Sequence, residues 1–367
     1  MTMPMDAAWT FMQDGIVFAE LNHQGSERGG TDLVAPNWWM GMASRDTPQG
    51  RFTFTGMVSL DPATVGKSGY RELFQSGEAL NGQPNVDRQH PHDLFMQLAA
   101  IWRMPVTSST GLTIAGGPVG EPALGPVAFM HRASAMDNPA APLAHHTLDS
   151  SHVAFGVVTA AVDHGPLVVE GSIFNGREPD ENRWDFDFGR LDSYAGRVWY
   201  RPNAAWEFQA SAGHLTEPEA LEPGQDITRT TFSASWMPIE GADITAITVA
   251  FGHNATAHGG RSALLLEGAR RVDVNTFYGR IEAAPAFETD AHARAVTIGG
   301  VHDVLAWRGF EGGVGADVTL YGVPDALQAS YGSHPVSFHV FFRVRPPAGP
   351  MGRMWNMRMS QPMNPRM

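Results

Sequence analysis

The feature that most constrains this fold is an alternation of apolar and polar residues that recurs along the chain. Residues 336–345 read VSFHVFFRVR, and the same alternation runs through 51–59, 206–213 and 229–236. Successive side chains of an extended chain point to opposite sides, so a period of two indicates β-strands with one apolar and one polar face. The repeated pattern lacks the 3.6-residue period of an amphipathic helix. The sequence therefore predicts an all-β protein.

The alternating segments have the length of membrane-crossing strands. They run for about 9–13 residues, which a tilted strand needs to cross a bilayer, whereas strands of soluble proteins more often have about 5–6 residues. We expect strands at 8–21, 37–46, 50–60, 92–104, 110–118, 151–163, 165–175, 191–201, 205–215, 227–238, 243–253, 260–270, 273–283, 293–304, 308–321 and 333–345.

The connections between these segments alternate between short and long. Turns such as 47–49, 202–204 and 271–272 are short, whereas 61–91 and 119–150 are long. Bacterial outer-membrane barrels have short periplasmic turns and long outer loops. The prediction is thus a single antiparallel transmembrane β-barrel of about 16 strands, with 12 to 18 left open. The barrel spans 1–346, and 347–367 form a Met/Pro-rich disordered periplasmic tail.

Composition excludes several other classes. No run approaches the roughly 20 apolar residues of a membrane-spanning helix. The net charge of −13 argues against nucleic acid as a partner, because phosphate binding needs a basic face. Cysteine is absent, which removes disulfides, thiolate metal sites and thiol nucleophiles. No G-x-S-x-G elbow, H-E-x-x-H motif or P-loop occurs, so we do not expect an enzyme.

One observation favours a soluble all-β protein instead. The start of the chain, Met1 to Asp6, shows neither the basic segment nor the apolar core of a secretory signal peptide, which an outer-membrane protein needs for export. In a soluble sandwich the apolar face would point inward. Tryptophans near strand ends, such as Trp38, Trp199 and Trp206, favour the membrane reading because they resemble an aromatic girdle.

A water-filled lumen would be lined by the charged residues of the polar face. Charges are cheap there and set ion selectivity, whereas in a sealed core each would cost several kcal/mol. The pore-lining residues expected from the alternation are Arg51, Arg103, Glu170, Arg197, Glu207, Arg229, Glu267, Arg280, Glu282 and Arg343. The third long loop, 119–150, is expected to fold into the lumen and form the constriction. Its charged residues are Glu121, Arg132, Asp137 and Asp149.

Three regions are candidate metal sites. Histidines close two long loops, at His90, His92, His145, His146 and His152. Imidazole with carboxylate suits zinc, copper or nickel, although the spacing matches no recognised signature and His90 and His92 would face opposite ways if extended. The tail offers thioether ligands for copper(I) at Met351, Met354, Met357 and Met359. The acidic stretch 176–187 suits calcium. We expect no cofactor, with copper and calcium as the alternatives.

Three stretches resemble a family of uncharacterised bacterial outer-membrane barrel proteins. They are RQHPHDLFM at 88–96, GEPALGP at 120–126 continuing to Asp137-Asn138-Pro139, and FNGREPD at 174–180. The resemblance covers about the middle third of the chain. It implies a porin-like barrel and, because the family tends to be associated with copper or heavy-metal resistance genes, a metal-related role. It carries over no functional residue.

The sequence therefore predicts a porin-like outer-membrane channel for small polar or ionic solutes. The expected partners are outer-membrane lipid and small solutes or metal ions, and a homotrimer is left open. The alternatives are a copper- or metal-binding barrel with little conductance, an outer-membrane hydrolase and a soluble all-β protein.

Overall fold

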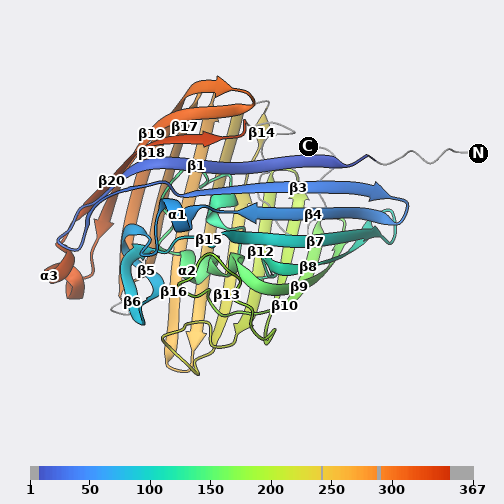
Figure 1. The fold of residues 1–367 in the computed structure, drawn as a ribbon, viewed down its shortest axis with the longest axis horizontal. Helices are drawn as coiled ribbons and strands as arrows, with labels where there is room; N and C mark the ends of the chain where they lie inside the picture. Colours follow the sequence, from blue (N-terminus) through green and yellow to red (C-terminus); the bar gives the residue numbers. More distant parts are fainter. Residues whose placement is uncertain (1–7, 241–242, 287–290, 348–367) are drawn as a thin grey trace, which may run out of the picture.

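A computed structural model describes residues 8–240, 243–286 and 291–347, and shows a closed antiparallel β-barrel (Figure 1). Sixteen strands form its wall. In the order in which they pair they are β1 (Thr10–Gln24), β3 (Asn37–Thr47), β4 (Gly50–Val58), β7 (Phe95–Pro105), β8 (Thr110–Gly120), β9 (Ala154–His164), β10 (Leu167–Phe174), β11 (Ser193–Asn203), β12 (Trp206–Leu215), β13 (Ile227–Trp236), β15 (Asp243–Thr256), β16 (Gly259–Val272), β17 (Asn275–Pro285), β18 (His292–Trp307), β19 (Phe310–Gly322) and β20 (Val336–Arg345).

The barrel closes between its first and last strands. β1 pairs with β20 from Val17 opposite Val344 to His23 opposite Phe338, and with β3 over its other half. β2 (Gly30–Val34) pairs antiparallel with the end of β1, and β14 (Ile239–Glu240) pairs antiparallel with the start of β15. All sixteen expected segments coincide with a wall strand to within a few residues, so the predicted fold class and strand number are confirmed.

Burial in the wall strands is the reverse of that in a soluble protein. Along β20, Phe338 and Val340 are exposed on the outside, whereas His339 and Arg343 are 2% and 0% exposed. The same order holds along β10, where Val169 faces out and Glu170 faces in. A soluble all-β protein buries its apolar face, so this alternative does not fit the structure.

The connections at one end of the barrel are short turns. At Arg308 and Gly309 both residues have positive φ, of 49° and 82°, as in the type I′ turns that match the twist of a hairpin. At the other end lie the loops L1 (25–36), L2 (59–94), L3 (121–153), L4 (175–192), L5 (216–226), L6 (257–258), L7 (described at residues 286 and 291) and L8 (323–335). L6 has only two residues, so the expected strict alternation of short and long connections fails there.

The loops contain the remaining secondary structure. L2 carries α1 (Asp61–Thr64) and a hairpin of β5 (Tyr70–Leu80) and β6 (Gln83–Gln89). L3 carries α2 (His145–Leu148) and the 3₁₀ turns η1 (Phe129–His131) and η2 (Ser150–His152), and L8 carries η3 (Asp325–Leu327) and α3 (Gln328–Tyr331). None of the helices among the described residues has the length and hydropathy of a membrane-spanning helix.

The interior of the barrel is packed with side chains from L2 and L3. Leu73 and Phe74 of β5 and Leu148 of α2 form one apolar cluster with inward-facing wall residues such as Leu265 and Tyr321. A second cluster joins Phe129 and Met130 of L3 to other inward-facing wall residues, among them Trp38, Met40, Tyr278 and Phe341. Trp38 and Trp199 are 3% and 1% exposed and point inward, so they do not belong to an aromatic girdle, whereas Trp206 is on the outside.

Candidate functional site

L3 lies inside the barrel and is buried over nearly all of its length. Only His146, Ser150, Ser151 and Val153 are more than slightly exposed between residues 121 and 153. The loop consists mainly of Ala, Pro, Gly, Leu and other small or apolar residues, so it can be withdrawn from water at little cost. Its few charged groups must then find partners on the wall.

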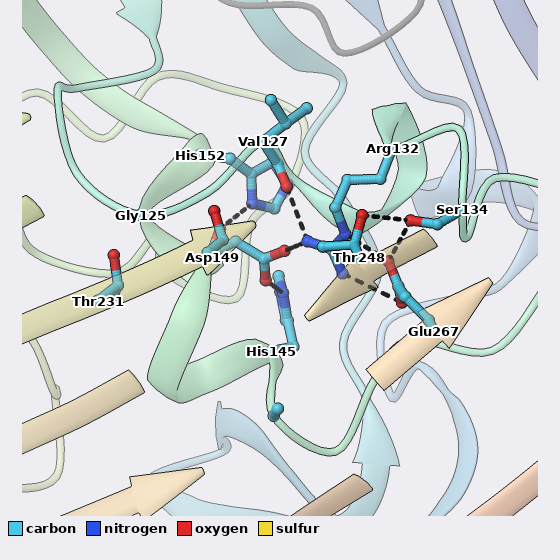
Figure 2. Close-up of polar contacts among 12 residues, drawn as sticks. Gly125, Val127, Arg132, Ser134, His145, Asp149, His152, Thr231, Thr248 and Glu267 are labelled. Carbon is cyan, nitrogen blue, oxygen red and sulfur yellow. Dashed lines mark hydrogen bonds and ion pairs between the residues drawn. The ribbon is translucent and has the colours of Figure 1, made fainter. Parts of the chain in front are cut away.

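Arg132 fixes the middle of L3 to the wall (Figure 2). Its Nε donates to Glu267 Oε1 of β16 at 2.6 Å, and its Nη1 donates to Asp149 Oδ2 at 2.5 Å and to the Val127 carbonyl at 2.7 Å. Ser134 Oγ donates to the same Glu267 oxygen at 2.8 Å. Arg132 and Glu267 are both buried, so each charge depends on the other for compensation.

Two further carboxylates of L3 pair with arginines of the wall. Asp137 accepts from Arg343 and Arg345 of β20. Glu121 accepts from Arg197 of β11 at 2.9 Å, and the same guanidinium donates to Glu170 of β10 at 2.5 Å. Each of the four charged residues expected in the constriction loop therefore has an ion-pair partner inside the barrel, three of them directly on the wall and Asp149 through Arg132.

The expected pore-lining residues divide into two groups. Most are buried inside the barrel against L3 or in its ion pairs: Glu170, Arg197, Arg229, Glu267, Arg280, Glu282 and Arg343. Arg51, Arg103 and Glu207 are only partly buried. Arg103 pairs with Asp163 next to the turn between β7 and β8, at 2.7 Å and 3.0 Å.

Five histidines from L2 and L3 converge, and we call them the histidine cluster: His90, His92, His145, His146 and His152. The ring centroids of His145 and His152 are 5.4 Å apart, and those of His92 and His152 are 5.9 Å apart. The ring centroid of His146 lies 5.2 Å from that of His145 and 5.7 Å from that of His90. The expectation that His90 and His92 face opposite ways does not hold, because residues 90–94 do not form a strand.

The Nδ1 atoms of three of these rings are held by acceptors. His92 Nδ1 lies 2.8 Å from Asp61 Oδ2, and His145 Nδ1 lies 2.6 Å from Asp149 Oδ1. His152 Nδ1 lies 2.8 Å from the carbonyl oxygen of Asp149. Ionised carboxylates and carbonyls only accept, so Nδ1 must carry the proton in each ring.

The opposite nitrogens have no hydrogen-bond partner. Within the described part of the chain, the Nε2 atoms of His92, His145, His146 and His152 are buried and unpaired. Burial lowers the pKa of His145 and of His152, which keeps these rings neutral at neutral pH. Since their Nδ1 carries the proton, each of these two neutral rings presents an Nε2 lone pair to the interior.

A small cavity borders the cluster where L2, L3 and L4 meet. Its volume is about 30 Å³, room for one or two water molecules or an ion. Among its lining residues are His90, His92, His152, Glu78, Asp93 and Glu178. Burial, opposed by nearby Arg183, raises the pKa of Asp93 to about 7. Burial and the neighbouring Glu78 raise the pKa of Glu178 to about 8.

The other two metal expectations have different outcomes. The tail methionines Met351, Met354, Met357 and Met359 lie outside the described residues. In the acidic stretch of L4, Asp180, Asp185 and Asp187 bring three carboxylate oxygens within 4.8 Å of one another, the one such group among the described residues. Asp180 and Asp185 are exposed, and exposed acidic groups gather without an ion, so this group carries no assignment.

Several residues around the cluster were not expected from the sequence. Asp61, Glu78 and Glu178 come from L2 and L4, far in the chain from His145 and His152. One signal for the inward-folded part of L2 was present, because Asn81-Gly82 has positive φ at both residues and forms the tight turn of the β5–β6 hairpin. Nothing in the sequence pattern indicates which carboxylate meets which imidazole.

No protein-family model matches the sequence, and no curated protein matches it significantly. The structure is similar to the anion-selective porin from Comamonas acidovorans, with a TM-score of 0.54 and 13% identity over 92% of this chain and 100% of that chain. The chain has the porin fold. OprB from Pseudomonas putida is similar with a TM-score of 0.55 and 8% identity, over 92% of this chain and 94% of that chain. The trimer form of OmpT from Vibrio cholerae is similar with a TM-score of 0.50 and 12% identity, over 92% of this chain and 99% of that chain. At these identities the likeness to porins concerns the fold alone.

Proposed function

We propose that this chain is an outer-membrane channel through which small polar or ionic solutes diffuse, and that it is not an enzyme. The inverted burial of the wall strands carries the proposal. A closed ring of strands with Val, Leu, Ile and Phe outside and charged residues inside suits hydrocarbon as the surrounding solvent, because each wall strand pairs with a neighbour on both sides. Outer-membrane lipid is then the partner of the outer face.

L3 would set the width of the path. Its ion pairs to Glu267, Arg343 and Arg197 tie it to three separate places on the wall, so it would narrow the lumen along much of its circumference. Solutes would pass beside a loop edged by charged groups, which favours polar and ionic solutes over apolar ones.

A second candidate is a barrel that conducts little. The observation in its favour is the packing of the interior, where apolar side chains of both L2 and L3 contact the wall. Such contacts are typical of a plug rather than of the edge of an open pore. The two candidates differ in the current they predict and agree on the fold.

Single-channel recording of the refolded chain in planar bilayers tests both. The channel proposal expects discrete conductance steps in the intact chain, and larger steps after truncation of 121–150. The low-conductance barrel expects steps only after truncation. No current from either chain, when both show the heat-modifiable gel migration of a folded barrel, would reject the channel.

One feature of the structure is consistent with the hydrolase alternative. His145 and Asp149 form a pair like that of a catalytic base and its orienting acid, at 2.6 Å. No hydroxyl among the described residues forms a hydrogen bond with His145 Nε2, which disfavours an activated serine. Turnover of short-chain nitrophenyl esters by the folded barrel would contradict the non-enzymatic proposal.

Self-association into a homotrimer is part of the proposal. The outer wall carries an open apolar depression of about 870 Å³ over β1, β3, β4, β7 and β8. Its lining includes small residues such as Gly41 and Ala43 and the aromatic residues Phe11, Trp39 and Phe54. A second copy of this wall fits such a depression better than disordered lipid chains do, since small residues allow close approach.

A role in copper or heavy-metal handling, implied by the family resemblance, is a separate hypothesis. The structural likeness to porins gives it no support, and the tail methionines lie outside the described residues. Copper(I) binding by the full chain and by a chain ending at residue 347 would test the tail directly, and equal binding by the two chains would contradict it.

A further inference from the structure

The histidine cluster has the inner organisation of a metal site without needing any help from the tail. Three rings, His92, His145 and His152, have Nδ1 held by Asp61, by Asp149 and by a backbone carbonyl. Metal-binding imidazoles are held in this way, because the outer hydrogen bond orients the ring and leaves the other nitrogen free for the ion.

The separations of His152 from His145 and from His92 are close to those of rings sharing one ion. With metal–nitrogen bonds of about 2.0–2.1 Å in a tetrahedral site, neighbouring ring centroids lie roughly 5 Å apart. The observed centroid separations are 5.4 Å for His145 and His152 and 5.9 Å for His92 and His152. The three Nε2 atoms are not within 4.8 Å of one another, so the rings would have to turn toward a shared ion.

Leaving these nitrogens as they are is unfavourable. A buried acceptor without a partner costs about 1–3 kcal/mol, and three of them belong to neighbouring rings. The carboxylates of Asp61 and Asp149 lie against His92 and His145, and the cavity beside the rings is lined by Glu78 and Glu178 as well as by Arg177, Arg183 and Arg229. The adjoining cavity of about 30 Å³ gives room for an ion and one bound water.

We propose that His92, His145 and His152 bind one divalent transition-metal ion that prefers imidazole ligands, of the zinc, copper(II) or nickel class. His146, whose Nε2 is also buried and unpaired, is placed to become a fourth ligand. The site joins L2 to L3 at the loop end of the barrel, so a bound ion would cross-link the two loops that fill the interior. This inference is independent of whether the barrel conducts.

The test uses the full chain without a histidine tag, refolded in detergent and stripped of metal with a chelator. Zinc(II) and copper(II) are titrated separately, with magnesium(II) as the comparison ion. One zinc or copper ion per chain is expected, with no measurable magnesium binding. His152→Gln should weaken binding by at least about tenfold, the size of effect that even outer-shell substitutions have. His302→Gln, on the exposed part of β18, is the matched control and should leave binding unchanged.

Electron paramagnetic resonance of the wild-type copper(II) complex keeps the test independent of any variant's folding. Hyperfine coupling to at least two imidazole nitrogens is expected. Absence of stoichiometric binding, coupling to oxygen ligands alone, or binding that survives both His152→Gln and His145→Gln in chains with heat-modifiable migration would overturn the proposal. Chains ending at residue 347 should bind zinc as the full chain does, which separates this site from the methionine tail.

Discussion

Arg132 Nε lies 2.6 Å from Glu267 Oε1, although the two residues are 135 positions apart in the sequence. The pair joins L3 to β16 in a region where both side chains are 2% exposed or less. Arg132 also holds Asp149, which in turn holds His145, so one guanidinium connects the wall, L3 and the histidine cluster (Figure 2).

Glu267→Gln should therefore destabilise the barrel by about 3–5 kcal/mol, because it leaves a buried guanidinium with too little negative charge. The measurement is the temperature at which the folded gel band converts to the unfolded one. Asp163→Asn is the matched control, since its pair with Arg103 is partly exposed and should cost at most about 1 kcal/mol. Equal losses in the two variants would show that Arg132 does not depend on Glu267.

Gly252→Val should displace L3 from the wall. A Cβ atom at Gly252 of β15 would lie 2.4 Å from the Thr147 carbonyl of α2, a contact that backbone cannot relieve without moving. If the chain conducts, the step conductance of the variant should exceed that of the wild type. Gly171→Val on the outer face of β10 is the control, because a Cβ there meets nothing closer than 3.6 Å. Unchanged conductance in a folded Gly252→Val barrel would mean that α2 does not limit the path.

Acidification should lower the free energy of unfolding of the barrel through protonation of His131 of η1. Its ring packs edge-on against Trp38, with centroids 4.4 Å apart. Burial and then His92 lower the pKa of His131 to about 3, with Asp149 opposing. The unfolded chain binds this proton below pH 6.5 and the folded chain only near pH 3, so the stability contribution is complete above pH 6.5 and is lost as the pH falls.

The free energy of unfolding should fall by about 1.4 kcal/mol for each pH unit below 6.5. Thermal unfolding of the wild type and of His131→Gln at pH 7.5 and pH 5 measures it. The other buried histidines titrate alike in both chains, so the difference between the two slopes isolates His131. Parallel pH dependences would contradict the assignment.

Asp61→Asn should weaken the proposed metal site without removing a ligand. Asp61 holds His92 Nδ1 at 2.8 Å, and loss of an orienting carboxylate lowers metal affinity by about 10–100-fold. Competition with a chromophoric chelator gives the zinc affinity of the variant. Asp226→Asn in the exposed loop L5 is the comparison and should have no effect. Wild-type affinity in Asp61→Asn would argue that His92 is not a ligand.

Gly41→Trp should abolish self-association while leaving the barrel folded. A Cβ at Gly41 meets no atom within 4 Å, and Gly41 lines the outer depression, so the backbone accepts a side chain that extends into it. Chemical cross-linking in detergent followed by gel electrophoresis reports the oligomer. Trimers that persist in the variant would place the subunit contact elsewhere on the wall.

The positions of the wall strands could be predicted from the sequence almost in full. The expected segment 260–270 corresponds to β16 (Gly259–Val272), and 333–345 contains β20 (Val336–Arg345). Even the inward direction of Glu170 and Arg343 followed from the alternation. The period of two is a local property, set by the geometry of one extended strand, so no knowledge of distant residues was needed.

The interior could be read only in outline. The sequence indicated that the third long loop enters the barrel, and the structure places it there, tied to the wall by Arg132. It did not indicate that the β5–β6 hairpin of L2 would pack beside this loop, although Asn81-Gly82 marked the turn. Treating 90–92 as extended also made a shared site for His90 and His92 look unfavourable.

The sequence alone determined the strands, their faces and their number, because each depends on residues within about ten positions of one another. Only the tertiary structure decided which charges meet and which histidines gather. Arg132 reaches Glu267 and His92 lies against His152 through contacts between residues 60 to 135 positions apart, and such contacts exist only after the barrel has closed around its loops. Burial makes these contacts necessary, because a charge or an imidazole withdrawn from water is costly unless it pairs with a group that the closed wall brings near it.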